Sequence, residues 1–183
     1  MRVVFFLLDT FFFFLVAAAL LRAWMNHQRI HMSAQPGRLV IAVTDWLVAP
    51  VRRILPRSLL QSRIDWGSLM TALLFALAYG GLWLMLAATL TQVEASPAAL
   101  LLAIPTLAIK LLLRTLLQGL MMLLLAYAVL SWVQPQSPML GTLDRLCAPV
   151  LRPVRKIVPA LGGVDVSVLV LIVLLQVGLM LLG

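Results

Sequence analysis

The chain has 183 residues, of which 63% are hydrophobic and 11% are charged, and its mean hydropathy is +1.09. A soluble domain of this length needs far more polar surface, so the composition excludes that class and predicts helices that cross a lipid bilayer. The net charge of +8 comes from basic residues beside apolar stretches, which favours membrane topology and anionic lipid over nucleic acid as the explanation.

The first predicted span covers residues 3–25, which are rich in Phe and Ala. A secretory signal peptide is the alternative, because a basic residue precedes the apolar stretch and three consecutive alanines provide a possible cleavage site. Asp9 interrupts the stretch, however, and the segment has a counterpart later in the chain, so we interpret it as a membrane helix. Arg22 and Trp24 at its far end are typical of an interfacial cation and an interfacial aromatic residue.

Residues 26–65 form a basic connection, in which apolar residues spaced along 39–47 predict a short amphipathic helix at the membrane surface. Prolines on both sides of a basic pair then predict a break in helical structure. This element consists of Pro50, Arg52, Arg53 and Pro56. Asp65 precedes the second predicted span, residues 66–91, and its carboxylate can cap the exposed amides of that helix.

The apolar stretch at residues 98–133 is too long for one straight span, because as a helix it would extend about 54 Å against a hydrocarbon core of about 30 Å. Pro105 and two cations lie in its first half. We therefore predict a tilted or interfacial helix at residues 98–112 and a span at residues 115–133, with two short spans as the alternative.

Residues 134–164 form a second basic connection, which begins with an apolar helical face and contains the pair Arg155 and Lys156. Helix-breaking and turn residues interrupt it, and they are Pro149, Pro153, Pro159, Gly162 and Gly163. Asp165 then precedes the last predicted span, residues 166–183, and is predicted to cap it as Asp65 caps the second span.

The sequence Pro-Val-Arg-Arg-Ile-Leu-Pro at residues 50–56 returns as Pro-Val-Arg-Lys-Ile-Val-Pro at residues 153–159. This recurrence indicates an internal duplication with units at residues 1–95 and 96–183. The predicted fold is an all-α membrane protein with about four transmembrane helices in two tandem two-helix repeats. Each repeat has an amphipathic, proline-broken basic connection, which the positive-inside rule places in the cytoplasm.

These residues resemble the YggT family of bacterial inner-membrane proteins, which is related to the YlmG proteins of Gram-positive bacteria and chloroplasts. The resemblance is strongest at residues 147–167; in the first copy Trp46 stands where Pro149 would align, and Arg63-Ile64 replaces the Gly-Gly turn. It implies an inner-membrane location and a link to osmotic or ion homeostasis, to cell division or nucleoid distribution, or, as in chloroplasts, to haem attachment. It supplies no catalytic residues.

The basic pairs form the first candidate site, composed of Arg52, Arg53, Arg155 and Lys156. One interpretation is a docking site for anionic lipid headgroups or for a protein partner. The other is structural, with the prolines holding a bend and the cations meeting phosphates at the interface. The two interpretations are compatible.

Two further sets of residues suggest other chemistry. Asp9, Lys110 and Arg114 are ionisable groups near predicted spans and are candidates for an ion pathway, although the cations can also extend from a bent helix to the interface. His27 and His31 are four residues apart, which on a helix places both imidazoles on one face for a metal or haem.

The sequence shows no nucleophile with a base, no carboxylate pair and no phosphate-binding glycine loop, so we predict no enzymatic activity, no catalytic residues and no bound metal or cofactor. We expect an assembly or organising factor that binds membrane lipids or a protein partner, does not bind nucleic acid and can self-associate. The alternatives are an ion or solute transport component in osmotic homeostasis, and haem handling for cytochrome assembly.

Overall fold

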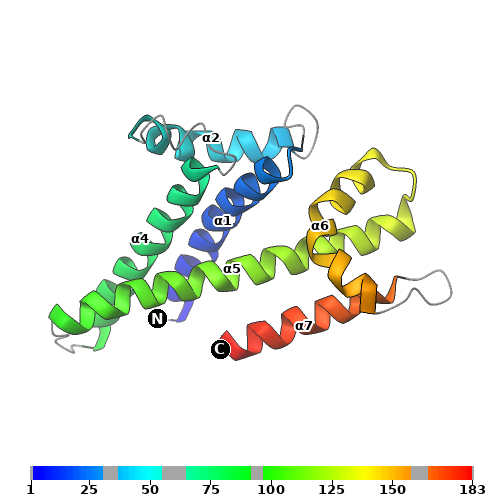
Figure 1. The fold of residues 1–183 in the computed structure, drawn as a ribbon. Coiled ribbons are helices and arrows are strands. Elements are labelled where there is room, and N and C mark those ends of the chain that lie inside the picture. The colour runs from blue at the N-terminus through cyan, green and yellow to red at the C-terminus, as the bar shows by residue number, and fades with distance from the viewer. Residues whose placement is uncertain (1, 31–36, 55–64, 92–96, 158–164, 183) are drawn as a thin grey trace.

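The computed structural model describes residues 2–30, 37–54, 65–91, 97–157 and 165–182. These residues form helices and no strand, which confirms the all-α prediction. The helices are α1 (Arg2–His27), α2 (Gly37–Ile54), α4 (Trp66–Thr91), α5 (Pro97–Val133), α6 (Pro138–Ile157) and α7 (Val166–Leu182) (Figure 1). Of the predicted motif residues, Pro56, Pro159, Gly162 and Gly163 lie outside the described residues, as does His31.

Within the described residues, three helices are long and apolar enough to cross a membrane, and they are α1, α4 and α5. The shorter α7 is also apolar, and its 17 residues extend about 26 Å at about 1.5 Å per residue. Large hydrophobic side chains such as Phe14, Leu74 and Met180 are exposed on these helices, as expected where lipid is the solvent. The protein is therefore a multi-pass membrane protein, and α1, α4 and α7 match the predicted spans closely.

The structure corrects the prediction for residues 98–133, because α5 is one continuous helix and Pro105 lies inside it. Neither the break between residues 112 and 115 nor the alternative of two short spans is found. The first half of α5 contributes Ala108 and Leu111 to a core with α1 and α4, whereas the second half contributes Leu124 to a core with α6 and α7. Both halves therefore have packing partners, and the helix continues through the segment that joins them.

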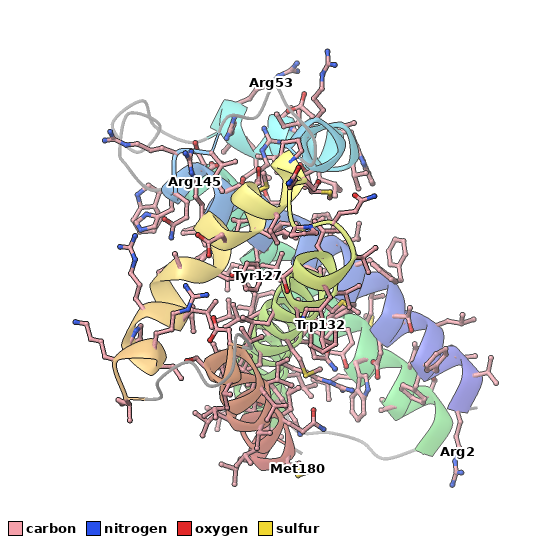
Figure 2. The ribbon with its side chains drawn as sticks, turned by 90° about the vertical axis from the view of Figure 1, so that its right-hand side faces the viewer. Arg2, Arg53, Tyr127, Trp132, Arg145 and Met180 are labelled. Atoms are coloured by element: carbon pink, nitrogen blue, oxygen red, sulfur yellow. The ribbon has the colours of Figure 1, made fainter. Side chains whose placement is uncertain are left out.

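The two amphipathic helices lie at corresponding places in the fold (Figure 1). Helix α2 crosses the ends of α1 and α4 that are farthest from the N terminus, and α6 packs against the ends of α5 and α7 that are farthest from the C terminus. In Figure 2, Arg53 of α2 and Arg145 of α6 lie on the side opposite Arg2 and Met180. Arg53 and Arg145 thus lie on one side of the molecule, and the placement of both basic connections in the cytoplasm stays a prediction.

A third apolar cluster joins the two halves of the molecule. Met25 of α1 and Val40 of α2 pack with Leu143 and Leu146 of α6, and all four are buried. The Trp24 indole Nε1 donates a hydrogen bond to the Leu146 carbonyl oxygen at 3.0 Å. These contacts fix the first amphipathic helix relative to the second.

Candidate functional site

The described prolines of the two basic connections do not end the helices that contain them, which corrects the breaks predicted at these residues. Pro50 lies inside α2, and Pro149 and Pro153 lie inside α6. All three are exposed, so water or headgroups can reach the carbonyl oxygens that lose their usual amide donor. The basic pairs consequently occupy the last turns of α2 and α6, where cations interact favourably with the helix dipole.

Arg52 in the last turn of α2 forms an ion pair with Asp65, the residue that precedes α4. Arg52 Nη2 lies 2.8 Å from Asp65 Oδ2, and the Asp65 side chain is only 4% exposed. The same carboxylate accepts hydrogen bonds from the Ser68 amide at 3.1 Å and from the Ser68 hydroxyl at 2.8 Å. Asp65 therefore caps α4, as predicted, and at the same time holds α2 against the start of that span.

Gly67 makes room for this ion pair. A Cβ atom at Gly67 would lie 2.6 Å from Cγ and 2.9 Å from Nε of Arg52, distances that real Cβ atoms essentially never show. The Arg52 side chain therefore lies directly across the first turn of α4. Any larger residue at position 67 would displace it from Asp65.

The second motif makes the same kind of contact. Arg155 in the last turn of α6 donates from Nε at 2.8 Å and from Nη2 at 2.6 Å to Oδ2 of Asp165, which precedes α7. Asp165 Oδ1 accepts a hydrogen bond from the Ser167 amide at 3.1 Å, so this residue also acts as a cap. Arg155 further donates to the Tyr127 hydroxyl of α5 at 3.2 Å. We refer to Arg52–Asp65 and Arg155–Asp165 as the Arg–Asp pairs.

The Arg–Asp pairs divide the four predicted cations into two classes. Arg52 and Arg155 are bound to carboxylates, whereas Arg53 and Lys156 are exposed and form no ion pair with any residue that the structure describes. Both capping residues were predicted from the sequence, but their arginine partners were not. The signal that indicates them is the recurrence, in both halves, of an arginine a short distance before the capping Asp.

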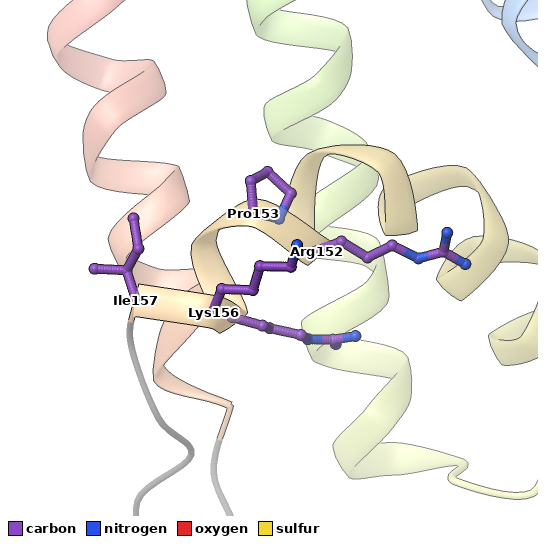
Figure 3. A pocket seen from close by; sticks show the side chains of 5 residues that line it. Arg152, Pro153, Lys156 and Ile157 are labelled. Atoms are coloured by element: carbon purple, nitrogen blue, oxygen red, sulfur yellow. The ribbon is translucent and has the colours of Figure 1, made fainter.

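A hollow of about 550 Å³ on α6 is lined in part by Arg152, a cation that does not belong to the predicted site. Arg152 lies one helical turn before Lys156, and both side chains are exposed. Figure 3 shows the two side chains extended toward the same side of α6, with Pro153 and Ile157 also lining the hollow. This surface presents two free positive charges beside the bound Arg155.

Arg22 is buried against α2 and bonded to it, whereas a cation extended toward lipid phosphates was predicted. Its side chain is 6% exposed and donates to the Thr44 hydroxyl at 3.0 Å and to Asp45 Oδ1 at 3.1 Å. Both partners belong to α2, which lies directly over this end of α1. A partner within reach removes the need for Arg22 to extend to lipid phosphates.

The predicted group of Asp9, Lys110 and Arg114 is not brought together by ion pairs. The Tyr79 hydroxyl of α4 donates to Asp9 Oδ1 at 2.9 Å, which joins α1 to α4. Lys110 and Arg114 are exposed, and no salt bridge links either of them to Asp9 among the described residues. An ion pathway through these groups stays a prediction.

The helix that would place His27 and His31 on one face ends at His27. Arg29 has a positive φ of 52°, and the Ile30 amide donates back to the Met25 carbonyl oxygen at 3.1 Å, a pattern that terminates a helix. Helix α1 therefore does not continue to His31, and the helical spacing that made the pair a candidate ligand set is not present in α1. Within the described ranges, no group of three potential metal ligands occurs.

Comparison with known proteins gives a consistent result. The CCB3/YggT family model matches residues 1–86 and 106–183, nearly the whole chain. The chain belongs to the CCB3/YggT family. Relatives in this family include "Uncharacterized protein YggT" of Escherichia coli (strain K12), 32% identical over 178 residues that cover 97% of this chain and 87% of the relative. "Uncharacterized protein in proC 3'region" of Vibrio alginolyticus is 31% identical over 185 residues, covering 100% and 95%. No solved structure matches significantly.

In this CCB3/YggT-family protein, the Arg52–Asp65 pair makes stability depend on pH. Burial by itself raises the pKa of Asp65, but hydrogen bonds from Arg52 and Ser68, together with the charge of Arg52, lower that pKa by more. The pair therefore stabilises fully above the unfolded carboxyl pKa of about 3.9, and this contribution is lost as the pH falls through the lower, folded-state pKa. We expect the free energy of unfolding to decline below about pH 4 and to decline less in Asp65→Asn. Parallel pH curves for the two proteins would contradict this.

The single cysteine, Cys147, packs in the core between α5, α6 and α7 and is free. Burial, with a smaller contribution from Asp144, raises the pKa of its thiol to about 11. The thiol is consequently neutral at physiological pH, as expected for a packing residue.

Proposed function

We propose that this CCB3/YggT-family protein is a non-enzymatic organising protein of the bacterial inner membrane whose cytoplasmic face binds anionic phospholipid headgroups. One observation carries the proposal: in each basic motif the first cation is held in an Arg–Asp pair, while the next cation, Arg53 or Lys156, is exposed. The bound arginine fixes the end of the amphipathic helix, and its neighbour is thereby held at the surface with its charge available.

The position of these cations supports lipid as the ligand. Both lie at the ends of amphipathic helices that adjoin membrane-crossing helices. Amphipathic helices of this kind lie at the level of the lipid phosphates. Arg145 and Arg152 add further exposed positive charge on α6. The short connection between α4 and α5 contains Glu94 and no cation, so the positive-inside rule supports a cytoplasmic orientation for the basic side.

The double variant Arg53→Gln/Lys156→Gln is expected to lose its preference for phosphatidylglycerol over phosphatidylcholine of the same chain length. A cation near an anionic surface contributes about 1 kcal/mol, so each replacement should lower the preference about fivefold. Native mass spectrometry of the purified protein with each lipid measures the retained fraction. Arg2→Gln, which removes one cation from the opposite side, should preserve the preference (Figure 2).

An unchanged lipid preference in a folded double variant would overturn the proposal. Loss of a protein crosslink in native membranes without any change in lipid retention would overturn it as well, because the basic face would then bind a protein partner. Circular dichroism of the double variant provides the folding check, since neither side chain takes part in an Arg–Asp pair.

A further inference from the structure

A second hollow, of about 410 Å³, lies between α2 and α4. Trp46, Pro50 and Val51 form its α2 wall, and Thr71, Leu74 and Ala78 form its α4 wall. The α4 residues are spaced by three and four positions, so they share one face of a helix that is apolar and long enough to cross the membrane. Leu74 is 52% exposed, and the hollow therefore opens toward the lipid.

The walls of this hollow are chemically suited to hydrocarbon. Thr71 is the one polar side chain among the described residues that line it, and its hydroxyl already donates to the Gly67 carbonyl oxygen at 2.7 Å. An extended peptide entering the hollow would leave its own amides and carbonyls without partners at membrane depth, which is costly. A chain of methylene groups has no such requirement.

The hollow is short compared with a transmembrane helix. From Thr71 to Ala78 the α4 wall is about 10 Å long, at about 1.5 Å per residue. A transmembrane helix is about 30 Å long, so this wall could contact only about a third of its length. A single hydrocarbon chain is the slimmer occupant.

The rim of the hollow is polar where its interior is apolar. Trp46, Pro50 and Arg53 are spaced by four and three residues, so they lie along one face of α2. Trp46 is 65% exposed, as is typical of an interfacial aromatic residue, and Arg53 is exposed just beyond Pro50. The second motif has Pro149 at the position that aligns with Trp46, so this rim is particular to the first half of the chain.

We propose that the α2–α4 hollow binds one acyl chain of an anionic phospholipid whose phosphate contacts Arg53. The inference rests on the proposed function, because it takes Arg53 as a headgroup-binding cation. Any hollow that faces the bilayer fills with hydrocarbon, and packing alone favours no particular lipid. The charge of Arg53 and the indole of Trp46 are what select a lipid and retain it at this position.

Photolabelling tests the site directly. The full-length protein is reconstituted in phosphatidylcholine vesicles with a small fraction of phosphatidylglycerol that carries a diazirine in the middle of one chain. Labelling is expected to concentrate on residues 46–51 and 71–78 relative to Leu82 and Met85, which are exposed farther along α4. Ala78→Phe should abolish this labelling by filling the hollow, and Ala88→Phe, an exposed position outside it, should preserve the labelling. Ala78→Leu provides a less bulky replacement if the phenylalanine variant does not fold.

The outcomes separate this inference from the proposed function. Uniform labelling along α4, or labelling unaffected by Ala78→Phe and Ala78→Leu, overturns the hollow as a lipid site even if Arg53→Gln/Lys156→Gln still weakens phosphatidylglycerol retention. Labelling that Ala78→Phe abolishes, but that does not distinguish phosphatidylglycerol from a matched diazirine phosphatidylcholine, overturns the anionic selection by Arg53 at this hollow. The proposed function is then decided separately, by phosphatidylglycerol retention in Arg53→Gln/Lys156→Gln. Crosslinking of position 78 to another protein's membrane segment in native membranes also overturns the inference.

Discussion

Replacing Arg52 with alanine is expected to lower the free energy of unfolding by about 2 to 4 kcal/mol. The change leaves the Asp65 carboxylate, which is only 4% exposed, without its cation at the junction of α2 and α4. Breaking a fully buried ion pair typically costs about 3 to 5 kcal/mol, and we expect less because the Arg52 side chain is 37% exposed. Unfolding of the purified protein in mixed micelles by increasing SDS measures the effect.

The adjacent residue provides the matched control. Arg53→Ala removes the same side chain one position later, where it is exposed and has no ion-pair partner among the described residues, so stability should change by less than about 0.5 kcal/mol. Adding Asp65→Asn to Arg52→Ala should recover part of the loss, because no buried charge is then left uncompensated. Equal stability of the Arg52→Ala and Arg53→Ala proteins would contradict the assigned role of the Arg–Asp pair.

Replacing Gly80 with alanine is expected to destabilise the protein by about 1 to 3 kcal/mol, because it overpacks the contact between α4 and α5. A Cβ atom at Gly80 would lie 2.8 Å from the Ile104 carbonyl oxygen. That oxygen belongs to the backbone of α5, so it cannot move aside without separating the two helices. Thermal unfolding in detergent, followed by the loss of helical circular dichroism, is the appropriate measurement.

Gly81 supplies the control for this prediction because it occupies the next position of the same helix. Among the described residues, and apart from the chain neighbours and the backbone of its own helix, no heavy atom lies within 4 Å of a Cβ atom built there, so Gly81→Ala keeps the helix contact intact. Alanine favours helix over glycine by about 1 kcal/mol, and this variant should therefore be as stable as the wild type or more stable. If Gly80→Ala were likewise neutral, the α4–α5 approach at this point would be looser than the structure shows.

The Arg–Asp pairs explain how one short motif can serve both structure and binding. Each pair joins the last turn of an amphipathic helix to the cap of the following apolar helix, so a single carboxylate terminates the connection and orients the next helix. Because this contact fixes the end of the amphipathic helix, it also fixes the backbone position of the neighbouring cation. A lone surface cation would instead sample many orientations, and its attraction for a headgroup would be reduced by the entropy of ordering it.

Much of this fold could be predicted from residues taken singly or in short segments. Unbroken apolar stretches require helices in lipid wherever they occur, so α1, α4 and α7 follow from composition alone. An Asp immediately before such a stretch is a cap regardless of its wider surroundings, and both Asp65 and Asp165 act in this way.

The other features of the fold depend on contacts between elements that are distant in the sequence. Breaks were expected between residues 112 and 115 and at the prolines of α2 and α6. Packing on both halves of α5 and the exposure of the proline rings of α2 and α6 instead allow these helices to continue. Arg22 was expected at the lipid surface and instead bonds to α2. The sequence by itself determined which segments enter the membrane, since transfer into lipid depends on each segment's own composition. Only the tertiary structure decided which cations are bound and which are free, because that depends on which carboxylates the fold brings within hydrogen-bonding distance.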